Sequence, residues 1–90
     1  MLQLVKDTLR ITWDSDDIYL TQIIGRGQQY LDELIGVGLD YDVTGLAQNL
    51  FLNYCRYDYN NALEYFEENF HKEILRLQLI EGGKLTGGTL

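Results

Sequence analysis

The sequence predicts an all-α fold, a small single-domain bundle of about four helices followed by a flexible C-terminal tail. Two observations lead to this prediction. The chain contains no proline, and the segment from Gly45 to Leu79 contains no further glycine. Apolar and aromatic side chains recur in this segment at the spacing of one helix face rather than at the alternating spacing of a strand. They include Leu46, Leu50, Tyr54, Tyr57, Leu63, Phe66, Phe70, Ile74 and Leu77.

A short first helix is expected over residues 2–9. Leu2, Val5 and Leu9 would lie on one face of this helix, which makes it amphipathic. The segment 10–13 is expected to end it.

The second helix is expected to begin after a cap provided by Asp14 or Ser15. Asp16 and Asp17 would then occupy its first turn, where negative charge interacts favourably with the positive end of the helix dipole. Gly36 supplies a left-handed stop. The apolar face between these signals consists of Leu20, Ile23, Ile24, Gly27, Tyr30, Leu31 and Leu34.

Two glycines, Gly25 and Gly27, lie in the interior of this second helix. Each costs about 1 kcal/mol relative to alanine at such a position. Their presence therefore predicts the close approach of another helix there.

Residues 37–43 form a connection, and Asp42 or Thr44 is expected to start the third helix. Residues 46–59 are apolar on most faces of a helix. This pattern is typical of a central helix with neighbours on several sides.

The long helical segment is expected to break. Asn61 and Glu64 have the spacing of a capping box, in which Asn61 accepts a backbone hydrogen bond and Glu64 reaches back. A break near Asn60 is therefore predicted, and Asn69 is a second candidate hinge.

The last ten residues include four glycines. We expect a helical domain over residues 1–81 and a flexible Gly-rich tail over residues 82–90. A chain of this size buries only roughly 60 to 65% of its unfolded surface, so assembly with other subunits would add stability.

The net charge of −7 argues against a protein that wraps a phosphate backbone, because such binding needs clustered basic side chains. The basic residues are scattered, so a helix-turn-helix DNA reader is not expected: Lys6, Arg10, Arg26, Arg56, Lys72, Arg76 and Lys84. Passive contact with double-stranded DNA is compatible with this charge, because an acidic channel wall repels the polymer.

A soluble protein of a reducing compartment is expected. The apolar stretches are far shorter than the ~20 residues that cross a bilayer, and residues 1–7 become charged too early for a signal peptide. Cys55 is the single cysteine and His71 the single histidine. An intramolecular disulfide and a Cys/His zinc site within one chain are therefore excluded.

Asp14, Asp16 and Asp17 weakly resemble a calcium-binding loop. Tyr19 and Gly25 stand where such a loop requires glycine and glutamate. A helix cap is the preferred interpretation.

Other candidate chemistry is equally weak. Cys55 lies in an aromatic helical run, where a free cysteine behaves as a small apolar residue rather than as a nucleophile with His71 as base. The segment 25–27 lacks the third glycine and the preceding strand of a dinucleotide-binding loop. The acidic segment 64–68 is most simply a solvated helix face. We predict no enzymatic activity, no cofactor and no metal.

The aromatic content exceeds what one small core needs. Tyrosine combines apolar area with a polar tip, and it is enriched at protein interfaces. Tyr57, Tyr59 and Tyr65 are therefore predicted to contact other subunits.

Five segments share their order with those of a known family. Residues 5–11 (VKDTLRI) lead through LRI to an acidic turn at residues 13–17 (WDSDD). Residues 23–36 (IIGRGQQYLDELIG) resemble the family pattern I..GR.YL..L.G with looser spacing, since three residues rather than one separate Arg26 from Tyr30. Residues 52–66 and 74–78 look like a third and a fourth helix. In this order the chain resembles the tailed-phage head-tail connector (adaptor) proteins.

This resemblance covers roughly residues 2–80, and it implies a small helical subunit of a ring, usually a dodecamer, beneath the portal protein of a phage capsid. Such a ring extends the DNA channel and docks head-closure or tail-completion proteins, and no catalytic residues are known in the family. The implied location is the head-tail junction of the virion, after synthesis in the bacterial host cytoplasm. Docking of the tail to the portal is also implied, with Lys84, Leu85 and Leu90 as contacts.

Two rival classes share some of these features. A non-enzymatic, acidic, helical interaction module of a cellular pathway would stay monomeric or dimeric with or without a portal. An enzyme would need a pocket with perturbed titrating groups, and its activity would depend on Cys55 and His71.

Overall fold

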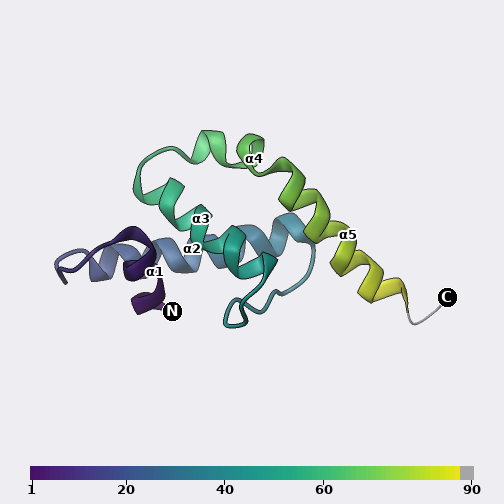
Figure 1. Ribbon diagram of the computed structural model, residues 1–90, viewed down its shortest axis with the longest axis horizontal. Helices are drawn as coiled ribbons and strands as arrows, with labels where there is room; N and C mark the ends of the chain where they lie inside the picture. Colours follow the sequence, from purple (N-terminus) through teal and green to yellow (C-terminus); the bar gives the residue numbers. More distant parts are fainter. Residues whose placement is uncertain (88–90) are drawn as a thin grey trace.

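The computed structural model describes the backbone of residues 1–87 and the side chains of residues 1–83. This part of the chain is helical and contains no strand, which confirms the all-α prediction. Figure 1 shows α2 along the longest axis, α1 and α3 packed against it, and α5 leading away at one end. The elements are α1 (Leu2–Leu9), α2 (Asp17–Ile35), α3 (Leu46–Tyr59), the one-turn 3-10 helix η1 (Leu63–Tyr65), α4 (Phe66–Asn69) and α5 (His71–Gly87).

The first helix, α1, has the predicted bounds. Arg10 ends it in the left-handed conformation with φ 60°, and the Ile11 backbone N–H donates to the carbonyl of Lys6 at 2.8 Å. Val5 and Ile11 are buried, so the helix and the segment after it both contribute to the core.

The start of α2 differs from the prediction. The helix begins at Asp17 with Asp16 at the cap position, so the assignment of the cap to Asp14 or Ser15 is wrong. The Lys6 ammonium explains the difference, because it draws Asp14 toward α1 at an N–O distance of 2.6 Å.

The glycines of α2 have three different environments. Gly36 adopts φ 97° and ends the helix as predicted. At Gly27 an added Cβ would lie 2.7 Å from Tyr54 Cδ1, so the close approach of α3 predicted there is confirmed. At Gly25 nothing lies within 4 Å of such an atom, so the close approach predicted there is wrong. Gly25 lies on the exposed side of α2.

The central helix is α3, which packs against α1, α2 and α5 as predicted. It begins at Leu46 with Gly45 at the cap position, so neither Asp42 nor Thr44 starts it. The Asp40 carboxylate instead accepts a hydrogen bond from the Asp42 backbone N–H at 3.0 Å. This local turn keeps residues 42–45 out of the helix.

The chain breaks at both predicted hinges. Asn61 adopts the left-handed conformation with φ 58° just after α3, and α4 ends at Asn69 before α5 begins. The predicted capping box is wrong, because Ala62 occupies the cap position of η1 and no side chain caps it. Asn61 ends the preceding helix instead of starting the next one.

The last helix continues further than the glycines predicted. It extends to Gly87, beyond the boundary expected at residue 81, because glycine weakens a helix without being forbidden in it. Residues 88–90 lie outside the described part of the chain. The flexibility of the tail stays a prediction.

The core lies where α2, α3 and the first half of α5 meet. Aromatic rings fill much of it: Tyr54 and Phe66 contact edge to face with ring centroids 5.7 Å apart, and Tyr41 lies 5.0 Å from Phe51. The buried apolar residues are Val5, Ile11, Leu20, Ile23, Leu31, Tyr41, Leu50, Phe51, Tyr54, Cys55, Phe66, Ile74 and Leu77.

Candidate interaction surfaces

Two of the three tyrosines predicted to contact other subunits take part in this chain's own fold. The Tyr57 ring packs edge to face on Phe70, with centroids 5.5 Å apart, and its hydroxyl accepts a hydrogen bond from Asn69. The Tyr59 hydroxyl donates to Asp16 at 3.0 Å and thereby joins the end of α3 to the start of α2. Only part of each ring is left for another subunit, since both are half-buried.

The third tyrosine, Tyr65, lies on η1 with 54% of its surface exposed. Exposed Leu63 and Glu64 are its neighbours in the chain. Of the three, Tyr65 is therefore the most accessible to a partner. The predicted tail contacts Lys84, Leu85 and Leu90 lie outside the residues whose side chains the structure describes.

A larger apolar surface, which the sequence reasoning did not single out, lies on the outer side of α5. Its residues repeat at i, i+3, i+4, i+7 and i+8, which places them on one face of the helix. Leu79 is 68% exposed. We call this surface the α5 face, and it consists of Lys72, Leu75, Arg76, Leu79 and Ile80.

The opposite side of α5 is fixed to the body of the protein. Ile74 and Leu77 are buried in the core, and the Gln78 side-chain amide donates to the carbonyl of Leu34 at the end of α2, at 2.9 Å. Among the described residues, only this inner side of α5 is covered, and Leu75, Leu79 and Ile80 stay exposed on the α5 face. Exposed apolar patches of this kind are typical of interaction sites.

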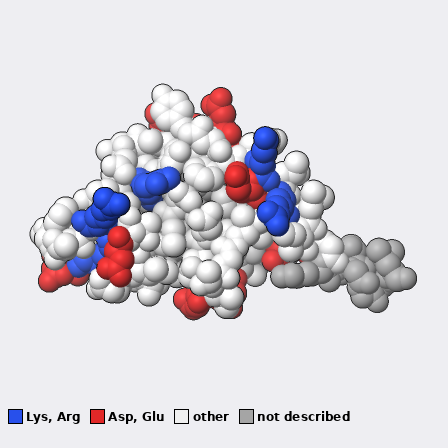
Figure 2. Space-filling view, viewed as in Figure 1, with Lys and Arg blue, Asp and Glu red and all other residues white. Residues whose placement is uncertain are grey.

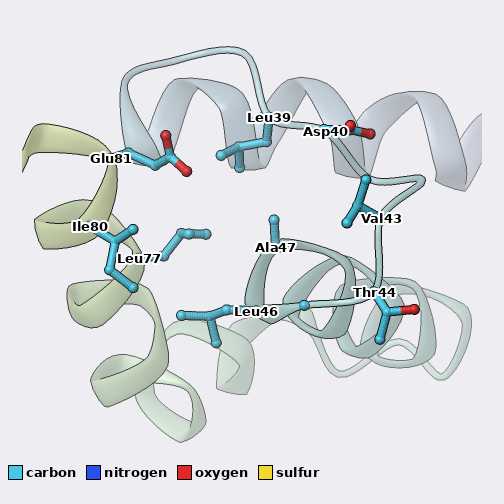
Figure 3. Close-up of a pocket in the computed structure, with 10 residues that line it drawn as sticks. Leu39, Asp40, Val43, Thr44, Leu46, Ala47, Leu77, Ile80 and Glu81 are labelled. Atoms are coloured by element: carbon cyan, nitrogen blue, oxygen red, sulfur yellow. The ribbon is translucent and has the colours of Figure 1, made fainter. Parts of the chain in front are cut away.

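A cleft of about 410 Å³ separates α5 from the loop between α2 and α3 (Figure 3). The loop is held on α2 by Asp32, whose Oδ1 accepts from the Tyr41 hydroxyl at 2.6 Å and from the Leu39 backbone N–H at 3.0 Å. The cleft is lined by Leu39, Asp40, Val43, Thr44, Gly45, Leu46, Ala47, Leu77, Ile80 and Glu81. Ile80 lines both, so the cleft and the α5 face adjoin at this residue.

A second exposed apolar surface lies where α1 leads into α2. We call it the N-terminal corner and define it by Trp13, Asp14, Ile18 and Tyr19. Ile18 is 80% exposed, and the side chain of Asp14 is 88% exposed. The Trp13 indole N–H donates to the carboxylate of Asp16 at 2.9 Å, which fixes the ring at the surface.

The N-terminal corner is built around one buried cation. The side chain of Lys6 is only 7% exposed, and its ammonium lies 2.6 Å from Asp14 and 2.8 Å from Asp17. Asp17 Oδ1 makes no hydrogen bond of good geometry, so its attraction to Lys6 is mainly electrostatic. Hydrogen bonds from Lys6 hold the pKa of Asp14 below its usual value, and hydrogen bonds from Trp13 and Tyr59 do the same for Asp16.

Figure 2 shows basic side chains in a few small groups on the face in view, with acidic side chains beside the groups at the left and at the right. Within the described residues, the ion pairs are made by Lys6 and Arg26, and neither Lys72 nor Arg76 takes part in one. Among the residues whose side chains are described, the cations of the α5 face thus make no ion pair, although the chain as a whole is strongly acidic.

The candidate nucleophile is enclosed. Cys55 is fully buried in α3, and this desolvation, reinforced by Asp58, raises the pKa of its thiol to about 12. His71 is exposed at the start of α5. The thiol is thus kept protonated and away from solvent at neutral pH. Among the described residues, no three histidine, cysteine or acidic side chains are placed to hold a metal ion.

Comparisons with protein-family models, with curated proteins and with solved structures found no match. Across residues 1–87, none of the helices combines the length and the apolar character needed to span a membrane. The features available for interpreting function are therefore the helical body, its acidic charge and the two exposed apolar surfaces.

Proposed function

We propose that this chain is a non-enzymatic structural subunit of a phage head-tail connector. In this role it forms a ring beneath the portal protein, extends the DNA channel and docks head-closure or tail-completion proteins. The proposal is supported by the order of the segments that resemble this family and, in the structure, by the uncovered α5 face. It applies to the chain as part of an assembled virion.

The α5 face carries most weight in this proposal. Its three apolar side chains, Leu75, Leu79 and Ile80, are exposed next to one another on a helix whose other side already forms part of the core. Large contiguous apolar patches on a small protein are typical of interaction sites. A subunit of a ring needs at least two such surfaces, one for each neighbour, and the N-terminal corner provides the second.

The acidic charge fits a channel for DNA. Carboxylates along a channel wall repel the phosphates of the duplex, so the polymer passes without binding. The same charge makes a nucleic-acid reader a poor interpretation, because binding needs clustered cations.

Electron microscopy of the chain mixed with the neighbouring portal protein tests this function. We expect the isolated chain to be a monomer or a weak oligomer, and a ring, expected to be a dodecamer, to form on the portal, because a symmetric template raises the effective concentration of subunits. A chain that stays monomeric or dimeric in the presence of the portal would instead support an interaction module of a cellular pathway.

Deleting residues 82–90 tests the proposed docking of the tail. The melting temperature should change little, because Gly82 and Gly83 are exposed and no side chain of the described core is removed. Portal association should weaken by about tenfold or more, which corresponds to about 1.4 kcal/mol. A full-length variant with Leu85→Ala and Leu90→Ala is the matched control. If the truncated chain binds the portal as tightly as the intact one, residues 1–81 alone make the contact.

A further inference from the structure

We infer that the α5 face of one copy docks on the N-terminal corner of the next copy, so that subunits associate head to tail. This inference rests on the proposed ring function and adds to it the pair of surfaces that meet. Three features of the structure support it: apolar area on both surfaces, opposite charge, and placement at opposite ends of the molecule.

Both surfaces expose large apolar side chains that the described part of the chain leaves at least partly uncovered. Leu75 and Leu79 project from α5, and Ile18 projects from the first turn of α2. Trp13 and Tyr19 add aromatic area to the corner. Aromatic and aliphatic side chains of this kind form the centre of protein interfaces, where they are shielded from water.

The charges of the two surfaces are complementary. The α5 face contributes Lys72 and Arg76 and contains no carboxylate. The corner and its supporting residues contribute three carboxylates, Asp14, Asp16 and Asp17. They also include the cation Lys6, which pairs with Asp14 and with Asp17. Even with the nearby Arg10 included, the corner is net acidic. Electrostatic complementarity of this kind favours the correct pairing and suppresses others.

A twofold contact between two α5 faces is less favourable for the same reason. It would bring Lys72 and Arg76 of both copies into one interface without a carboxylate from the face itself. Pairing with the corner provides the missing negative charge.

The two surfaces are also too far apart to cover each other within one chain. The molecule is 50 Å long, and in Figure 1 the connection between α1 and α2 lies near one end while α5 forms the other. When the α5 face of one copy binds the N-terminal corner of a second copy, the pair still has one free corner and one free α5 face. Further copies can therefore add through the same contact. Such a contact closes into a ring when the rotation between copies allows it.

Disulfide trapping tests this pairing, even when association is weak. Two full-length variants are made, Ile18→Cys in the corner and Leu79→Cys on the α5 face, and they are mixed in equal amounts under mild oxidation. The native Cys55 should not interfere, because it is buried and its thiol stays protonated. We expect the mixed disulfide in several-fold excess over the two homodimers, whereas random pairing would make it equal to their sum.

Two controls identify the cause of this excess. A Gln29→Cys variant carries its thiol at another exposed position of α2 and should pair at random with Leu79→Cys. Adding Lys72→Glu and Arg76→Glu to the Leu79→Cys variant should reduce the mixed disulfide several-fold, and high salt should reduce it in the original mixture. Circular dichroism of each variant checks that the helices are intact.

Two outcomes would overturn the inference. They are random pairing of the Ile18→Cys and Leu79→Cys variants, and a preference of the Leu79→Cys variant for its own homodimer, which would indicate a twofold contact. The proposed function fails separately. If the variants are trapped head to tail but the chain does not bind a portal, the inference stands and the proposed function fails. If the chain forms a ring on the portal but the variants pair at random, the proposed function stands and the inference fails.

Discussion

Alanine substitutions at Gly25 and Gly27 should change the stability of this protein in opposite directions. Both glycines lie inside α2, two residues apart in sequence, so the gain in helix propensity is the same at each. They differ in what a new methyl group would meet. At Gly25 nothing lies within 4 Å, whereas at Gly27 the nearest atoms belong to the rings of Tyr54 and Phe51.

The expected magnitudes follow from these surroundings. Replacing glycine by alanine in a helix interior stabilises by about 1 kcal/mol, and Gly25→Ala should show this full gain. At Gly27 the new Cβ would lie 2.7 and 2.9 Å from carbons of the Tyr54 ring and 3.0 Å from the Phe51 ring. Overpacking of this kind costs about 1 to 3 kcal/mol. Both rings are buried, so we expect the upper half of that range and a net loss of about 1 to 2 kcal/mol.

Urea and thermal unfolding followed by far-ultraviolet circular dichroism measure both variants. For a domain of this size, about 1 kcal/mol corresponds to a shift of roughly 4 to 8 °C in melting temperature. Gly25→Ala should therefore melt higher than the parent protein and Gly27→Ala lower, with unchanged dependence on urea. If Gly27→Ala is as stable as Gly25→Ala, the packing of α3 on α2 described above is incorrect.

Three further predictions concern buried and charged groups. Arg26→Met leaves the buried carboxylate of Asp58 without its guanidinium, 3.0 Å away, and should cost about 1 to 2 kcal/mol in urea unfolding, since Arg26 is half exposed. Cys55 should react with a thiol reagent at pH 8 only at the rate of unfolding; fast reaction of the native protein would contradict its burial. The pKa of Asp14 is lowered, mainly by its hydrogen bond from Lys6, so its contribution to stability is complete above its unfolded value of 3.8 and is lost as the pH falls through the lower folded value. Acid titration should show this loss below about pH 4, and Asp14→Asn should reduce it.

Much of the backbone was predictable because the signals are local. Gly36 adopts the left-handed conformation that a helix stop requires, and the asparagines near residues 60 and 69 mark real breaks. The apolar spacing of residues 46–59 also predicted a helix with several neighbours. These signals depend on the conformation of a few adjacent residues, which the sequence specifies directly.

Features that depend on tertiary contacts were less predictable. Spacing alone does not show that Gly27 faces α3 while Gly25 faces solvent, because that depends on how α2 is rotated in the fold. Asp14 was expected to cap α2, but Lys6, eight residues earlier, attracts it through a contact across the turn. The sequence also did not show that Tyr57 and Tyr59 each have a polar partner within the chain, while their contact with other subunits stays a prediction.

The same limit explains why the α5 face was missed. Leu75, Leu79 and Ile80 alternate with the buried Ile74 and Leu77, so the sequence of α5 shows two apolar sides and does not indicate which one packs on the core. Only the fold separates them. A helix of this kind gains most of its stability from packing rather than from intrinsic propensity, and the far half of α5 leads away from the body (Figure 1). Covering the α5 face with a neighbouring subunit would therefore stabilise the helix and bury its apolar side in a single step, without any rearrangement of the core.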